Sequence, residues 1–152
     1  METFSLFILP LSIFFIFIGV LIYFIKMAAA KYSFTIEQGA TLDFQIDWTD
    51  DSGSAIDLTG YSARMQIRPQ VESDEVFISL SSELQPDGTG LNLSGSNSAN
   101  PLESGSIGIF ISAYSSSLLD FGRAVYDLEM VNGNYVTRLM EGYVNLSKNV
   151  TR

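Results

Sequence analysis

The sequence predicts an all-β domain built from short strands. Several segments alternate apolar and polar residues with period two, as the residues of half-buried strands do. Clusters of Gly, Asn, Asp and Ser separate these segments at fairly even spacing and supply the turns. One weak helical stretch, residues 113–121, interrupts them. Together these three observations predict two packed sheets with little helix.

The segment 56–68, IDLTGYSARMQIR, combines a turn and a strand. Asp57 and Gly60 are turn formers, and Gly60 can take a positive φ without steric cost. Pro69 ends the strand because it has no N–H to donate to a ladder. The alternation predicts a core-facing row of Tyr61, Ala63, Met65 and Ile67 and an outward row of Ser62, Arg64, Gln66 and Arg68.

Two strands are expected before this segment. Residues 33–37 are typical of a first strand at the edge of a sheet, and residues 41–48 show the clearest alternation, with Trp48 in the core. If the second of these strands paired with the one that carries Arg64 and Arg68, its outward aspartates would form cross-strand ion pairs with them.

The second half of the chain supplies the remaining strands. Gly108 falls on the outward face of its strand and is expected to let a neighbouring segment approach closely. Ser112 or Ser115 is expected to cap one helical turn, with Leu118 and Leu119 packing under the sheet. The expected strands are residues 76–81, 89–93, 106–112, 123–131, 135–141 and 143–146, with a hairpin turn at 132–134 and a bulge or bend at Gly142.

This succession favours an immunoglobulin-like antiparallel β-sandwich of seven to nine strands, with a small closed barrel as the structural alternative. The sandwich is expected to span residues 27–152 as a single domain. A hydrophobic helix over residues 1–26 is expected to precede it.

The apolar stretch at residues 4–25 has three interpretations. It is long enough, as a helix, to cross the hydrocarbon core of a membrane. It also suits a helix buried in a protein assembly, or a region upstream of a natural start at Met27. If it is a membrane anchor, Lys26 and Lys31 after it place the following domain on the cytoplasmic side.

The composition argues against several functional classes. The chain has no Cys and no His, so Cys or His zinc sites and the usual catalytic triads are excluded. A net charge of −9 disfavours a nucleic-acid partner. The Asp-rich turn at residues 49–54 departs from the spacing of a calcium loop and predicts a solvated hairpin. No pair of carboxylates is placed across a cleft, so we expect no enzymatic activity, no metal and no cofactor.

Two segments together resemble a family of small bacteriophage structural proteins. The first is IDLTGYSARMQIRP (56–69). The second spans residues 122–152, in which Gly122 is followed by RAVYDLEMVNGNYVTRLMEGYVNLSKNVTR. Members of that family read approximately "DLTGY–ARMQIR" early and, after a glycine, "RAVYDLE … TRLLEG … VTR" to the end. The resemblance runs from about residue 28 to residue 152 and leaves out residues 1–26. The family is similar to the immunoglobulin-like domains of phage tail and baseplate proteins, including the N-terminal part of baseplate upper proteins.

The resemblance implies a non-enzymatic virion component, present as a homo-oligomer or in many copies, with other virion proteins as partners. A tail or baseplate component is the first expectation, and a capsid decoration or cement protein is the alternative. A membrane-anchored β-sandwich that binds a partner is the second alternative. Candidate partner-binding residues are Arg64 and Arg68 on the outward face, and Phe34 and Ile36 in the edge strand, where a proline at Ile36 is expected to block assembly and leave the domain folded.

Overall fold

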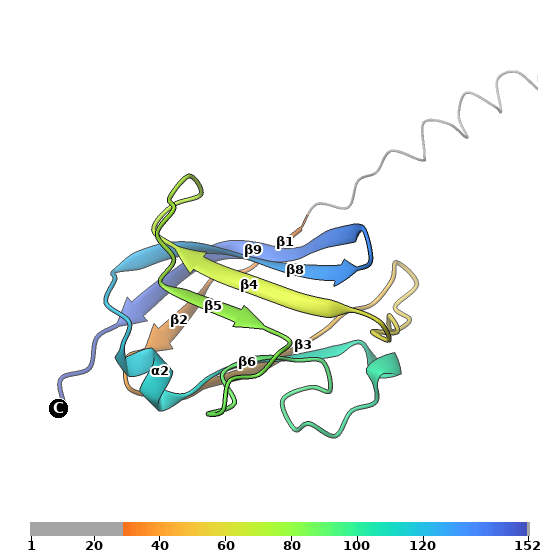
Figure 1. Cartoon of the computed structure of the whole chain (residues 1–152), viewed down its shortest axis with the longest axis horizontal. Coiled ribbons are helices and arrows are strands. Elements are labelled where there is room, and N and C mark those ends of the chain that lie inside the picture. The colour runs from red at the N-terminus through yellow and green to blue at the C-terminus, as the bar shows by residue number, and fades with distance from the viewer. Residues whose placement is uncertain (1–28, 152) are drawn as a thin grey trace, which may run out of the picture.

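The structure, a computed structural model, describes residues 29–151 and contains nine strands in two sheets (Figure 1). The hydrophobic helix expected over residues 1–26 lies outside the described residues. No helix within residues 29–151 is long and apolar enough to cross a membrane. The elements are β1 (Ala30–Lys31), β2 (Phe34–Glu37), β3 (Leu42–Asp47), β4 (Ser62–Arg68), β5 (Ile78–Ser81), β6 (Gly90–Asn92), the 3-10 helix η2 (Leu102–Ser104), β7 (Ser106–Ile111), α2 (Ala113–Ser117), β8 (Arg123–Asn132) and β9 (Tyr135–Ser147).

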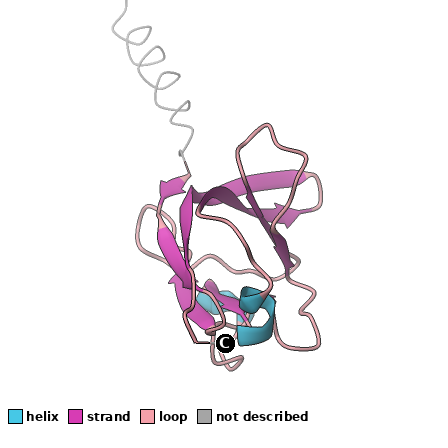
Figure 2. Cartoon of the chain, turned by 90° about the vertical axis from the view of Figure 1, so that its left-hand side faces the viewer, coloured by secondary structure: helices cyan, strands magenta, loops and turns pink. Residues whose placement is uncertain are grey.

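The larger sheet has the strand order β1-β9-β8-β4-β5, and β2 also pairs with β9. The smaller sheet has the order β3-β7-β6. Figure 2 shows the strands as two facing layers, with both short helices on the side away from the larger sheet. The prediction of an all-β fold of two sheets with little helix is therefore confirmed.

One hydrophobic core fills the space between the two sheets. The row of Tyr61, Ala63, Met65 and Ile67 turns toward it as the alternation predicts, and the last three of these side chains are buried. Trp48 also packs against the core, with its ring 5.5 Å from that of Tyr61. Strands β7 and β8 contribute the other large buried group, which comprises Ile107, Ile109, Ile111, Ala124, Tyr126, Leu128 and Met130.

Strand pairing is antiparallel except along one edge, where β1 and β2 run parallel to β9. The expectation of a wholly antiparallel sandwich is wrong at this edge. Both strands belong to the larger sheet and lie on the side of β9 opposite β8. Gly142 lies where the segment between β1 and β2 packs directly against β9. A Cβ on Gly142 would overlap the carbonyl oxygen of Tyr32. The hydroxyl of Tyr126 donates a hydrogen bond of 2.8 Å to that same oxygen.

The bulge expected at Gly142 is found instead at Leu139. Leu128 pairs with Met140 and Glu129 pairs with Arg138, which leaves Leu139 as the extra residue of β9. Gly142 has the different role of admitting the neighbouring strand, and β9 runs through it without a break.

Two local predictions are confirmed in the smaller sheet. A Cβ on Gly108 would lie 2.7 Å from the backbone nitrogen of Ser96, so the glycine does permit a close approach. Ser112 caps α2, because its side chain accepts a hydrogen bond from the backbone N–H of Ser115. Leu119 is buried under the sheet, whereas Leu118 is 67% exposed and does not pack as expected.

The conditional pairing of β3 with β4 does not occur. β3 belongs to the smaller sheet and pairs with β7, whereas β4 lies between β8 and β5 in the larger one. Asp43 and Asp47 therefore cannot form cross-strand ion pairs with Arg64 and Arg68. Strand β8 supplies the neighbouring carboxylates instead.

Candidate functional site

The larger sheet turns one face away from the core, and this outer face forms an open groove of about 730 Å³. Strands β4, β8 and β9 supply its floor, and the loop after β4 borders it through Val71. The floor carries long polar and charged side chains because each strand alternates and its apolar residues are committed to the core. We treat this outer face as the candidate site, with the groove-lining residues Lys31, Arg64, Gln66, Arg68, Val125, Asp127, Glu129, Arg138, Glu141 and Tyr143.

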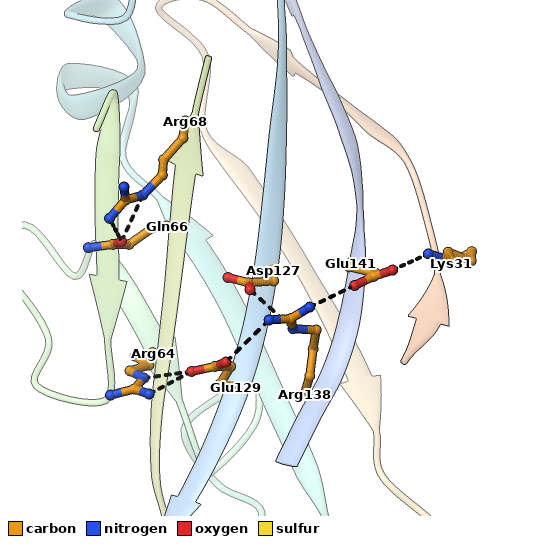
Figure 3. A network of polar contacts seen from close by, with 8 residues as sticks. All are labelled: Lys31, Arg64, Gln66, Arg68, Asp127, Glu129, Arg138 and Glu141. Atoms are coloured by element: carbon orange, nitrogen blue, oxygen red, sulfur yellow. Dashed lines mark hydrogen bonds and ion pairs between the residues drawn. The ribbon is translucent and has the colours of Figure 1, made fainter. Parts of the chain in front are cut away.

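An ion-pair network crosses the floor of the groove (Figure 3). Arg64 on β4 contacts one carboxylate oxygen of Glu129 on β8 through Nε at 2.8 Å and Nη2 at 2.7 Å. Arg138 on β9 lies 3.2 Å from Asp127, 3.8 Å from Glu129 and 3.2 Å from Glu141. Lys31 extends the network to β1 by pairing with Glu141. The network thus joins four strands, the hairpin of β8 and β9 together with β1 and β4 from earlier in the chain.

The bulge at Leu139 is what brings Arg138 into this network. With strict alternation, Arg138 would share the inward face of Met140, which is buried. The extra residue shifts the alternation, so that Arg138 lies opposite Glu129 on the outer face. Arg138 and Glu141 then point to the same side although they are three residues apart.

Two carboxylates of the network have shifted pKa values, in opposite directions and for different causes. Burial raises the pKa of Asp127, although the nearby Arg138 guanidinium acts to lower it. The hydrogen bond from Lys31 lowers the pKa of Glu141, and Arg138 contributes in the same direction. Glu141 therefore stays ionised to lower pH than an ordinary glutamate, whereas Asp127 takes up a proton at higher pH than an ordinary aspartate.

Two cations on the outer face lie apart from this network. Arg68 donates hydrogen bonds to the side-chain oxygen of Gln66 and to the backbone carbonyl of Ser73. Arg123 places its guanidinium carbon 3.8 Å from the centre of the Tyr143 ring. Within residues 29–151, neither guanidinium has a carboxylate at ion-pair distance. Both therefore keep an unneutralised positive charge at the surface.

The four candidate partner-binding residues separate into two groups. Arg64 and Arg68 line the groove, as the outward row of β4 predicts. Phe34 and Ile36 are 9% and 0% exposed, so their side chains belong to the core rather than to a contact surface. What β2 can offer a partner is its backbone edge.

The backbone groups at the free edge of β2 come from the residues that alternate with Phe34 and Ile36. Tyr32 and Gln38 donate their backbone N–H groups to carbonyl oxygens of β9. Alternate residues of a parallel strand face the same neighbour, so Ile36 also turns its backbone toward β9. Thr35 and Glu37 turn their backbone N–H and C=O groups away from the sheet. A partner strand would meet these groups.

Sequence reasoning missed Lys31, Asp127, Glu129, Arg138 and Glu141 as members of the site. The alternation of β8 places Asp127 and Glu129 outward, so the sequence could have predicted that both residues lie on the outer face. The pairing of β4 with β8, and the bulge in β9, carry no comparable mark in the sequence.

The polar groups of the outer face contact one another along and across the strands. The carboxylates of this face are engaged by cations, and within residues 29–151 no group of three or more acidic side chains is placed to hold a metal ion. The face combines arginine, tyrosine and valine, a mixture that is common in protein–protein contacts.

Comparisons with known proteins do not assign the chain to a family. No family model matches it. No curated protein matches its sequence.

Proposed function

We propose that this chain is a non-enzymatic bacteriophage virion protein, a tail or baseplate component that acts through protein–protein contacts. One observation carries the proposal. The two segments that resemble phage structural proteins are far apart in the sequence, yet they fold as the adjacent strands β4, β8 and β9. Their charged residues meet on the outer face, where Arg64 pairs with Glu129 and Arg138 contacts three carboxylates.

We also propose that the two sheets form a variable-type immunoglobulin-like sandwich. In such a domain one sheet has the strand order G-F-C-C′ and the facing sheet contains B, E and D. The orders β9-β8-β4-β5 and β3-β7-β6 agree with this arrangement. The chain has no Cys, so the two sheets are held by the shared hydrophobic core without the inter-sheet disulfide of antibody domains.

Contacts with other virion proteins would use two kinds of surface. The outer face offers a groove whose residues are held by the ion-pair network, so a partner meets a surface that is already ordered. The β2 edge offers backbone groups of Thr35 and Glu37 for strand addition.

The proposal is tested on phage particles purified from a lysate of the phage that encodes the chain. Mass spectrometry of the particles is expected to find peptides from residues 29–151, and an antibody against the chain is expected to label the tail or baseplate in negative stain. Label over the capsid would point to the decoration or cement alternative. Absence from particles with recovery in the membrane fraction would contradict the virion proposal and favour the anchored binding module.

A further inference from the structure

We propose that copies of this chain associate head to tail, with the acidic turn of one copy bound to a cationic patch on the outer face of the next. The cationic patch comprises Arg68, Arg123, Val125 and Tyr143 on the outer face. The acidic turn comprises residues 47–57. This inference deepens the proposed virion function and names a second copy as one partner of the outer face.

The residues of the cationic patch are brought together by strand register. Arg68 lies directly opposite Val125, and Val125 lies directly opposite Tyr143. Arg123 is two residues before Val125 and covers the Tyr143 ring. Two positive charges thus flank an apolar surface of Val125 and Tyr143, the latter 47% exposed. A carboxylate between the guanidiniums would neutralise charge that the chain itself leaves uncompensated.

Positive charge is concentrated on the outer face. The sequence has eight Lys and Arg residues, of which Lys26 and Arg152 fall outside residues 29–151. Of the six that remain, only Lys148 lies off the outer face, and it pairs with Asp120. The five on the outer face are Lys31, Arg64, Arg68, Arg123 and Arg138.

The acidic turn is the complementary surface. It carries Asp47, Asp50, Asp51 and Asp57, and no Lys or Arg occurs between Lys31 and Arg64. Every residue from position 49 to position 55 is exposed. The turn is held in shape by Asp50, which accepts backbone hydrogen bonds from Ser52 at 2.8 Å and from Ser54 at 2.9 Å. A protruding turn of fixed shape is suited to an open groove.

The two surfaces lie at opposite ends of the sandwich, so a single chain cannot join them. The acidic turn follows Trp48, whose ring contacts Tyr61 just before the first residue of β4. The cationic patch lies at Arg68, the last residue of β4. Figure 1 shows the turn at the right-hand end of the domain and the end of β4 at the left. Contact between unlike surfaces on two copies gives a ring or a filament rather than a symmetric dimer.

Cross-linking between cysteine variants distinguishes this arrangement from a symmetric one. The chain has no Cys, so single cysteines can be placed in the full chain without a competing thiol. Val71→Cys labels the rim of the groove and Ala55→Cys labels the acidic turn, and both positions are exposed. With a short bis-maleimide, a mixture of the two variants is expected to give about tenfold more dimer than either variant alone. Equal yield from Val71→Cys alone, or no dimer from the mixture, would overturn the proposal.

Charge substitutions in the same cysteine backgrounds test the chemistry of the contact. Arg123→Glu is expected to lower the cross-linking yield by about tenfold, whereas Lys148→Gln, a cation off the outer face, leaves it unchanged. Combining Arg123→Glu with Asp51→Lys in one chain exchanges the charges at every contact and is expected to restore the yield. Association through residues 1–28 would be insensitive to all three changes and would count against the contact.

These outcomes are separable from the fate of the proposed function. If particles contain the chain but the cysteine mixture does not cross-link, the head-to-tail contact is wrong and the virion proposal stands. If the chain cross-links as expected but is absent from particles, the contact stands and the virion proposal is wrong.

Discussion

At the scale of single residues, the most informative positions are those where the backbone of one segment meets another. Gly142 and Gly108 are both explained by such approaches, at Tyr32 and at Ser96. Neither has a positive φ, so the absence of a side chain, and not conformational freedom, is what the fold requires there.

Gly142→Ala is expected to lower the free energy of unfolding by about 1–3 kcal/mol, because the new methyl group pushes the backbone at Tyr32 away from β9. Urea unfolding measures the loss. Gly122→Ala is the matched control, since a Cβ there meets nothing within 4 Å. Equal stability of the two variants would show that the strand at Tyr32 moves without cost.

Asp87 predicts a specific acid sensitivity. Its carboxylate accepts hydrogen bonds from the side chains of Ser112 and Ser115 and from the backbone of Thr89, and the Ser112 bond is the main cause that lowers its pKa from 3.8 to about 2. A group with a depressed folded pKa stabilises above its unfolded pKa, and the effect fades as the pH falls through the folded value. We therefore expect Asp87→Asn to be less stable than the wild type at pH 5 and the difference to shrink between pH 4 and pH 2. Urea midpoints measured across this range check the prediction, and a constant difference would contradict it.

At the scale of elements, the edge strand and the ion-pair network define what each strand can contribute. β2 buries its apolar side chains and leaves only alternate backbone groups at the edge. β9 contains both the bulge at Leu139 and the close backbone approach at Gly142. The bulge places Arg138 beside the carboxylates of β8.

Thr35→Pro is expected to block strand addition at the β2 edge and leave the domain folded, because its N–H faces away from β9. Ile36→Pro is expected to lower stability by at least about 3 kcal/mol, since it removes a buried side chain and a ladder donor. The informative proline position is therefore Thr35 rather than Ile36. Circular dichroism melts of the two variants decide the matter, and an unfolded Thr35→Pro chain would contradict the assigned backbone direction.

Arg138→Met is expected to lower the free energy of unfolding by about 1 kcal/mol at pH 7, a modest loss because the side chain is about half exposed. The variant leaves Asp127, Glu129 and Glu141 without their shared cation, so their repulsion remains. Protonation relieves that repulsion, and the loss should therefore diminish in acid. Chemical denaturation at pH 7 and pH 4 tests this, with Lys148→Gln as a control for loss of an exposed ion pair.

At the scale of the whole molecule, one core holds both sheets. Its buried side chains come from β2, β4, β5, β8 and β9 of the larger sheet and from β6 and β7 of the smaller one. Neither sheet can bury its apolar face alone. The described part of the chain is therefore expected to behave as one cooperative unit.

Unfolding is expected to show a single transition with coincident probes. Trp48 is the only Trp and sits where the smaller sheet leads into β4, so its fluorescence reports contact between the two layers. Far-UV circular dichroism reports both sheets together. Coincident urea curves support one unit, whereas an earlier fluorescence transition would show that the layers separate before the strands are lost.

The sequence by itself determined most of the strands, their inward faces apart from that of β9, and most of the turns. Period-two alternation decides these features, because each strand must place one row of side chains in the core whatever it pairs with. The outward position of Arg64 and Arg68 and the close approach at Gly108 were predictable for this reason. The cap at Ser112 was predictable from local hydrogen bonding.

Only the tertiary structure decided which strands pair and what the outward residues meet. β3 and β4 are consecutive in sequence but belong to different sheets, so the aspartates expected beside Arg64 lie across the core. Glu129 and Arg138 take that place through pairing that depends on long-range packing and on one bulge. Alternation specifies the face of a residue and carries no information about its neighbour on the next strand. The groove, the network and the two unneutralised arginines therefore appeared only when the strands were assembled.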